Sequence, residues 1–203
     1  MSNILLNADS YKASHFLQYP QNTSTVSSYI ESRGGLFDAT LFFGLQAFIK
    51  QTLLKPFNQA DIDEADELLT AHGVPFNRAG WQYILDTYNG YLPLEIQAVP
   101  EGSVVATHNV LVQVQNTDAN CAWLTSYIET ALLRAVWYST TVATVSYQCK
   151  QVIACYLAAT ADSMDGLLFK LHDFGSRGAS SEETAALGGM AHLVNFMGSD
   201  TVN

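Results

Sequence analysis

The spacing of hydrophobic and polar residues divides the chain into three stretches of different character. In the first, STVSSYIES (24–32) has an extended pattern, and GLQAFIKQTLL is a helical stretch that starts at Gly44. Two more helices are predicted from NQADIDEADELLTAHG (58–73) and NRAGWQYILDTYNG (77–90), because each begins with a polar capping residue and ends at glycine. This stretch is therefore predicted to combine short strands with helices.

Strand-like alternation dominates the second stretch. LPLEIQAV (92–99) and NVLVQVQN (109–116) alternate apolar and polar residues, and a Pro-Glu-Gly turn at 100–102 joins them. Such runs are typical of half-buried strands in a mainly antiparallel sheet. We expect this sheet to form a layer of its own.

The third stretch returns to a helical period and ends in a strand-helix-strand pattern. Residues 119–160 predict two helices that are broken near Ser139. LLFKLHDF (167–174) predicts a strand of about seven residues, SSEETAALGGMAHLV (180–194) a helix, and VNFMGSD (194–200) a second strand. Together they predict a βαβ unit with parallel strands.

These patterns predict an α/β fold in two parts. Residues 1–118 are expected to form an N-terminal α/β domain with a mainly antiparallel sheet. Residues 119–203 are expected to form helices and the first βαβ portion of an incomplete α/β barrel, because one such unit cannot close a barrel. The length of 203 residues and the hydrophobic fraction of 48% are sufficient for a globular core.

Charge and cysteine content narrow the class of protein. The net charge of -10 disfavours generic binding to nucleic acids or anionic membrane surfaces. No apolar run is long enough to cross a membrane, and the N-terminus does not resemble a secretory signal, so a cytoplasmic protein is expected. Cys121, Cys149 and Cys155 have no metal-ligand spacing and are predicted to be reduced core thiols.

Three chemically different side chains are predicted to meet at one end of the βαβ unit. Parallel strands end on the same face, which in α/β barrels carries the chemistry. Phe174 and Arg177 follow the first strand, and Asp200 ends the second. We therefore expect an aromatic ring, a guanidinium and a carboxylate on one rim.

Two interpretations of these residues remain open from the sequence alone. Ser180 and Glu183 match a capping box, and with Arg177 and the glycines at 175 and 178 that helix start could bind an anion, although capping boxes are also common as purely structural features. Phe174 could either cap the core or stack on a flat ligand. A carboxylate beside a stacking ring would favour a neutral ligand with N–H donors.

The histidines and the common catalytic motifs add no further site. His172 and Asp173 are adjacent in a strand and point to opposite faces, so they cannot form a dyad by themselves. His192 lies in the predicted helix and is expected to be a packing or helix-capping residue. His15, His72 and His108 show no metal-ligand spacing. Nucleophile-elbow, Walker A and dinucleotide-binding motifs are absent from the sequence.

The chain resembles the nicotinamide phosphoribosyltransferase family along nearly its whole length. The resemblance is carried, in this order, by NADSYKASHFLQYP, ESR, FFGLQ, LPLEIQAVPEG, NVLVQVQNTD, WLTSYIET, KLHDFGSRGASSEETA and HLVNFMGSDTV. The segment between Arg33 and Phe42 is shorter than in animal members, which indicates a bacterial member. The resemblance implies the type II phosphoribosyltransferase fold, a cytoplasmic homodimer and a role in NAD biosynthesis and pyridine nucleotide salvage.

The resemblance also implies an activity and roles for six residues. The family forms nicotinamide mononucleotide and pyrophosphate from nicotinamide and phosphoribosyl pyrophosphate, with Mg²⁺ and ATP. Phe174 and a partner subunit's Tyr11 would sandwich the nicotinamide ring, Asp200 would accept the carboxamide N–H, and Arg177 would lie by the ring and sugar phosphate. A partner subunit's Arg33 would contact phosphate, and Asp9 is a further candidate near Tyr11.

Family members are more than twice as long, so the resemblance implies a fragment that lacks the downstream catalytic residues. We expect no turnover by the isolated chain, no tightly bound cofactor, and no catalytic residue upstream of Asn203. Ser176 stands where animal members have tyrosine, a change that a loop should tolerate. The alternatives are a non-catalytic binding or dimerisation module and the related nicotinate phosphoribosyltransferase, which Asp200 disfavours.

Overall fold

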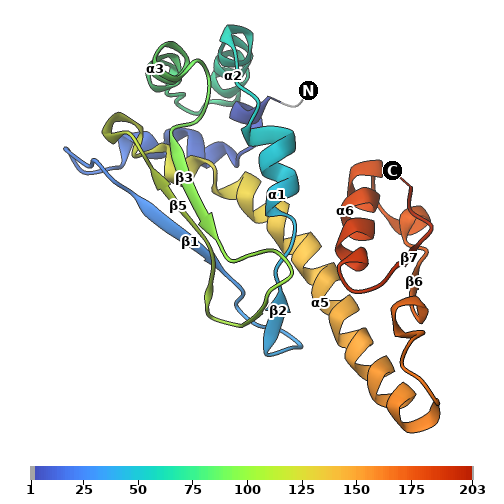
Figure 1. Ribbon diagram of the computed structural model, residues 1–203. Helices are drawn as coiled ribbons and strands as arrows, with labels where there is room; N and C mark the ends of the chain where they lie inside the picture. The colour runs from blue at the N-terminus through green and yellow to red at the C-terminus, as the bar shows by residue number, and fades with distance from the viewer. Residues whose placement is uncertain (1–2, 203) are drawn as a thin grey trace. The chain divides into compact units, whose positions relative to one another are not determined.

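A computed structural model describes residues 3–202 (Figure 1). The chain separates into two compact units. Unit 1 consists of Met1–Glu31, Gln46–Ala98 and Val110–Arg134. Unit 2 consists of Ser32–Leu45, Val99–Asn109 and Ala135–Asn203. Both units draw on separate segments of the chain, and the domain boundary after residue 118 stays a prediction.

An antiparallel sheet organises unit 1, as the alternating pattern predicted. Its strand order is β1 (Ser27–Glu31), β5 (Val110–Asn116) and β3 (Leu94–Ala98), and the three strands lie side by side in Figure 1. The central strand is the most buried: Val112 and Val114 alternate with the exposed Gln113, and Leu111 is buried as well where the register with β1 shifts between Ile30 and Glu31. Val112 and Val114 therefore share the face of the sheet that is turned to the core.

The link between β3 and β5 is more complex than the predicted Pro-Glu-Gly turn. A further strand, β4 (Val104–Ala106), lies between them and pairs with β2 (Ala39–Leu41) in a two-stranded ribbon of unit 2. The turn at 100–102 is present, and the N–H of Ser103 donates to the carbonyl of Pro100 at 3.1 Å. The turn therefore leads into β4, and β5 begins only after a second turn.

Helices α2 (Gln59–His72) and α3 (Arg78–Tyr88) form where their end signals predicted them. Asn58 and Asp61 make a capping box at the start of α2, and Gly73 ends it with a positive φ of 84° that glycine adopts at low cost. Trp81 of α3 is 1% exposed and packs edge-on against three other aromatic rings. These rings belong to Phe57, Trp123 and Tyr127. The helix pair is thus fixed over an aromatic core.

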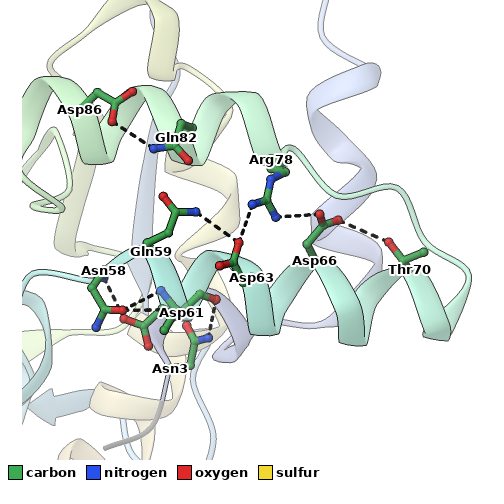
Figure 2. Close-up of polar contacts among 11 residues, drawn as sticks. Asn3, Asn58, Gln59, Asp61, Asp63, Asp66, Thr70, Arg78, Gln82 and Asp86 are labelled. Carbon is green, nitrogen blue, oxygen red and sulfur yellow. Dashed lines mark hydrogen bonds and ion pairs between the residues drawn. The ribbon is translucent and has the colours of Figure 1, made fainter.

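Polar contacts also join α2 to α3 on their exposed side, as Figure 2 shows. The guanidinium of Arg78 forms ion pairs with Asp63 and with Asp66, the latter at 2.9 Å. Gln59 Nε2 donates to Asp63 at 3.2 Å, and the Arg78 hydrogen bond lowers the pKa of Asp63. Exposed ion pairs contribute little to stability, so this cluster orients the helix pair more than it stabilises it.

Short helical segments complete unit 1. They are η1 (Ile4–Leu6), η2 (Ser10–Leu17), α1 (Leu45–Phe48) with the π-helical η3 (Ile49–Leu53), η4 (Ala119–Cys121) and α4 (Leu124–Tyr127). Leu45 itself is assigned to unit 2. The buried Lys12 of η2 pairs with Glu129, so its charge is compensated.

Helix α5 (Glu129–Thr160) runs unbroken through Ser139, where two helices were predicted. The prediction was wrong because the hydroxyls that disfavour helix in isolation have partners here. Ser139 Oγ lies 2.9 Å from the carbonyl of Ala135 in its own helix and 2.9 Å from that of Phe43. Thr140 Oγ1 also donates to Phe43 O at 3.1 Å. Buried, satisfied hydroxyls are compatible with a continuous helix.

The predicted βαβ unit forms, with shorter strands. β6 (His172–Asp173) and β7 (Gly198–Ser199) pair in parallel, and α6 (Glu182–Leu193) lies between them in the chain. The predicted seven-residue strand was wrong, because residues 167–169 form a 3₁₀ turn, η5 (Leu167–Phe169), in which the Phe169 N–H donates to Gly166 O at 3.0 Å. Only the last part of the run therefore pairs with β7.

Helix α6 packs beside α5 within unit 2 (Figure 1). His192 is 6% exposed, lies 3.0 Å from Ser146 Oγ through Nδ1, and stacks on Phe196 at 5.2 Å. Asn195 Nδ2 donates to the carbonyl of Ala143 at 3.0 Å. The predicted packing role of His192 is confirmed.

The cysteines are only partly core residues. All three are unpaired, but only Cys121 is buried, Cys149 is half-buried and Cys155 is exposed. The prediction of three core thiols was wrong for Cys155, because that turn of α5 lies on an open face. Burial raises the pKa of Cys121 to about 12.

Among residues 3–202, no helix is both long and apolar enough to span a membrane.

Candidate functional site

The loops that follow β6 and β7 begin side by side. The two strands are parallel, with His172 opposite Gly198 and Asp173 opposite Ser199, so both loops leave from the same edge. Phe174 is the first residue after β6, and Asp200 is the first after β7. The N–H of Asp200 donates to the carbonyl of Asp173 at 2.9 Å. The structure thus brings Phe174 and Asp200 to one rim, as predicted.

His172 connects the ring and the carboxylate. Its Nε2 lies 3.0 Å from Asp200 Oδ1, and its ring centroid lies 4.9 Å from that of Phe174. An ionised carboxylate only accepts, so Nε2 carries the donated proton. The Phe174 side chain is 60% exposed, which excludes the interpretation that it caps the core. Its ring is therefore available to a flat ligand.

A close approach across the β6–β7 ladder fixes the histidine. A Cβ atom at Gly198 would lie 2.1 Å from His172 Nδ1, far inside van der Waals contact. Only glycine leaves room for this ring position. Sequence reasoning did not assign His172 to the site, and the available signal was its spacing of two residues from Phe174 in a strand, which places both on one face.

Asp173 faces away from His172 and ties the two loops together. Its Oδ1 accepts the Gly175 N–H at 2.8 Å, and its Oδ2 accepts the hydroxyls of Ser199 and Thr201, each at 2.9 Å. Burial raises the pKa of Asp173, but these three hydrogen bonds and the charge of His192 outweigh it and leave the pKa below its ordinary value. The carboxylate is therefore held ionised.

Arg177 extends the same rim. It belongs to the 3₁₀ turn η6 (Ser176–Gly178) and is exposed. The following helix begins differently from the prediction: Ser181, not Ser180, is its N-cap and accepts the Thr184 N–H at 3.1 Å. Ser181 has the extended backbone that a cap needs, so the predicted pair of Ser180 and Glu183 was wrong by one residue.

The other three predicted residues lie elsewhere in the chain. Arg33 is exposed in the loop between β1 and β2, and Tyr11 is 53% exposed in η2, with its ring 5.3 Å from that of His15. Asp9 precedes η2, and its Oδ2 accepts the Thr130 hydroxyl at 2.6 Å. Tyr11 and Asp9 belong to unit 1 and Arg33 to unit 2. Their part in the site stays a prediction.

The residues present do not form a metal site. Across positions 3–202, no group of three or more His, Cys, Asp or Glu side chains is arranged to hold a metal ion. The Mg²⁺ that the sequence resemblance implies therefore does not fit any cluster of these residues.

Comparison with protein families supports the sequence motifs. Residues 3–96 match the model of the nicotinamide phosphoribosyltransferase N-terminal domain, and residues 169–203 match that of the nicotinate phosphoribosyltransferase family. The second match contains both loops of the rim. Each match covers less than half of the chain.

Individual relatives match the chain nearly end to end. A nicotinamide phosphoribosyltransferase of Xanthomonas campestris is 58% identical over 204 residues, which is 100% of this chain and 43% of that protein. One of Acinetobacter baylyi is 35% identical over 214 residues, 97% of this chain and 42% of that protein. The chain thus spans less than half the length of these two relatives.

Two solved structures have a similar fold. The crystal structure of human nicotinic acid phosphoribosyltransferase matches 94% of this chain and 35% of its own with a TM-score of 0.66 at 21% identity. Nicotinate-nucleotide pyrophosphorylase from Pyrococcus furiosus matches 98% of this chain and 40% of its own with a TM-score of 0.55 at 16% identity. Both support the predicted α/β fold with its antiparallel sheet. The resemblance of this chain to the nicotinamide phosphoribosyltransferases, predicted from its motifs, is therefore confirmed along its whole length.

Proposed function

We propose that the chain supplies the nicotinamide-recognising part of a nicotinamide phosphoribosyltransferase of NAD biosynthesis. The observation that carries this proposal is the arrangement in which His172 contacts both the exposed Phe174 ring and the Asp200 carboxylate. Nicotinamide is a flat pyridine ring with a carboxamide, so it needs a stacking surface and an N–H acceptor within a few ångströms of each other. The β6–β7 rim offers both.

Charge sets the preference between nicotinamide and nicotinate. Asp200 can accept a hydrogen bond from the carboxamide N–H of nicotinamide. Nicotinate would place a second carboxylate against it, which costs free energy through like-charge repulsion. His172 donates to Oδ1 of Asp200 and leaves Oδ2 for the ligand. The rim therefore favours the amide.

The proposed reaction is a pentosyl transfer. The ring nitrogen of nicotinamide forms a bond with the anomeric carbon of phosphoribosyl pyrophosphate, while the carbon–oxygen bond to pyrophosphate breaks and its electron pair leaves with pyrophosphate. Phe174 and Asp200 contribute by holding the ring so that its nitrogen faces that carbon. Arg177, three residues after Phe174, would lie between the ring and the sugar phosphate.

A second copy of the chain belongs to the proposal. Tyr11 and Arg33, both exposed, would come from the partner subunit of a homodimer, with Tyr11 covering the second face of the ring and Arg33 contacting phosphate. Asp9 would support Tyr11 from the start of η2. We also propose a cytoplasmic location and, for the full-length enzyme, the use of Mg²⁺ and ATP. Among residues 3–202, no group of three or more His, Cys, Asp or Glu side chains could hold the metal ion.

Calorimetry with nicotinamide and nicotinate tests the proposal. We expect the chain to bind nicotinamide in preference to nicotinate, and Asp200→Asn to bind nicotinamide about tenfold more weakly and to lose most of the preference. Asp165→Asn, an exposed aspartate in a turn before β6, is the matched control and should bind as the unchanged chain does. The mass in solution, measured on the same sample, reports the dimer.

Two results would contradict this assignment. A preference for nicotinate would favour nicotinate phosphoribosyltransferase, to which the family match over residues 169–203 also points. The absence of binding by a folded dimer would favour a module without a nicotinamide site. Formation of nicotinamide mononucleotide by the isolated chain is not expected, and measurable turnover would show that it carries the catalytic residues as well.

A further inference from the structure

Asp173 contacts both loops of the rim without facing the rim itself. It is adjacent to His172 in β6, so its side chain points to the opposite face of the strand pair. From there its carboxylate reaches Gly175 in the first loop and both Ser199 and Thr201 around the second. Phe174 lies between Asp173 and Gly175, and Asp200 lies between Ser199 and Thr201. Phe174 and Asp200, the two proposed ligand-contacting residues, are thus each flanked in the chain by residues that are held by the Asp173 carboxylate.

The donors around Asp173 require a carboxylate. One backbone N–H and two hydroxyls donate to it, and an ionised carboxylate has enough lone pairs to accept all three. An asparagine would offer a single oxygen and would present N–H groups to the hydroxyls instead. The lowered pKa of Asp173 is consistent with an ionised group at neutral pH.

The backbone around this network is closely packed. A Cβ at Gly175 would lie 2.8 Å from Asp173 Oδ1, and a Cβ at Gly189 of α6 would lie 3.1 Å from Cβ of Thr201. Thr201 N–H in turn donates to Ser199 Oγ at 3.0 Å. Neither loop can move far without breaking hydrogen bonds to Asp173.

We propose that Asp173 is the positioning residue of the nicotinamide site. Its carboxylate sets the spacing between the Phe174 ring and the Asp200 carboxylate, because it holds the backbone next to Phe174 and on both sides of Asp200. The identity of the ligand in this proposal rests on the proposed function. The hydrogen bonds by which Asp173 holds the two loops do not depend on that function. Asp173 touches neither ligand nor reacting atoms. Its removal should therefore act by loosening the rim, while the groups that contact the ligand remain present.

Amide hydrogen exchange, measured by NMR on the ligand-free chain, tests the positioning directly. In Asp173→Ala, the amides of Gly175 and Thr201 should exchange at least about tenfold faster, because the first loses its acceptor and the second loses the anchor of its acceptor. Thr201→Val removes one hydroxyl and keeps the side-chain shape. It should loosen residues 199–201 and leave Gly175 protected.

Asp118→Ala is the matched control. Asp118 also accepts several hydrogen bonds, from Tyr83, Tyr88 and the N–H of Asn120, but it lies in unit 1. This variant should lower thermal stability and leave exchange at Gly175 and Thr201 unchanged. The comparison separates loss of positioning from general destabilisation.

Nicotinamide affinity is measured on the same variants by calorimetry. Asp173→Ala should bind about 10- to 100-fold more weakly, as misplaced contact groups do, and Thr201→Val should fall between it and the unchanged chain. Unchanged exchange at Gly175 and Thr201 in Asp173→Ala would overturn the positioning role. If Asp173→Ala does not fold, Thr201→Val decides: loosening at 199–201 alone supports the role, and no loosening refutes it. If the unchanged chain does not bind nicotinamide, the proposed function fails while exchange still decides the role of Asp173.

Discussion

Replacing Gly198 by alanine should displace His172 and so separate the ring from the carboxylate. The new Cβ would lie 2.1 Å from His172 Nδ1 and 2.9 Å from its Cε1, whereas carbon and nitrogen atoms in contact are about 3.5 Å apart. The imidazole must therefore move by more than about 1 Å. The backbone of Gly198 has no positive φ, so alanine adds no strain of its own. The effect of the substitution should come from the ring alone.

The magnitude follows from the contacts that the movement breaks. The hydrogen bond from His172 to Asp200 is 3.0 Å long, and a shift of this size removes it. The two side chains are 41% and 59% exposed, so we expect only about 0.5–1 kcal/mol lower stability, which is about 1–4 °C in Tm for a chain of this size. Affinity for nicotinamide should fall more, by about tenfold, because the rim loses its spacing.

Gly178→Ala provides the control for this experiment. Gly178 lies on the same rim, but a Cβ there would meet no atom within 4 Å. Alanine at this position should leave Tm unchanged or raise it slightly, since it restricts the unfolded chain. Thermal unfolding and calorimetry should be measured on both variants. Equal Tm and equal affinity in Gly198→Ala and the unchanged chain would refute the reasoning.

Three further predictions concern unit 1. Asn58→Ala removes the side-chain acceptor of the Ala60 and Asp61 amides and should lower the free energy of unfolding by about 1 kcal/mol in urea titrations, whereas no change would contradict the assigned cap. The hydrogen bond to Asp118 raises the pKa of Tyr88 to about 12. The contribution of this hydrogen bond to the free energy of unfolding should therefore be complete below the ordinary tyrosine pKa of about 10 and be lost as the pH rises through about 12. In Asp118→Asn, spectrophotometric titration should find that pKa lower, and an unchanged value would show that another group causes the shift. Arg78→Ala should change stability less than Asn58→Ala does at moderate salt, because its ion pairs are exposed, and a larger loss would show that the cluster in Figure 2 is stabilising.

The features that local sequence determines were predictable. α2 and α3 begin and end where Asn58, Gly73 and Asn77 indicated, because capping depends on residues within one turn of the helix end. The helix start at Ser181 was missed by one residue, since two adjacent serines offer the same side chain. The extended backbone of Ser181 identifies it as the N-cap, and the sequence alone does not show that conformation.

The features that depend on distant partners were not predictable from local patterns. Ser139 continues a helix because Phe43, far away in the sequence, supplies a carbonyl for its hydroxyl. β6 is shorter than the predicted strand because residues 167–169 form their hydrogen bonds within a turn. The spacing of His172 from Phe174 is visible in the sequence, but its contact with Asp200 depends on the register opposite Gly198, which one sequence does not specify.

Two hydroxyls of α5 occupy the free edge of β2. β2 has β4 on one side only, and on its other side the N–H of Leu41 donates to Thr144 Oγ1 at 2.9 Å and that of Phe43 to Thr140 Oγ1 at 3.2 Å. The helix therefore occupies the backbone groups with which a strand of another molecule would pair. Thr140→Val and Thr144→Val would keep the packing volume but leave both N–H groups without an acceptor beneath the helix. This edge could then pair with another molecule whenever α5 moves away, so the expected defect is aggregation on standing at high concentration.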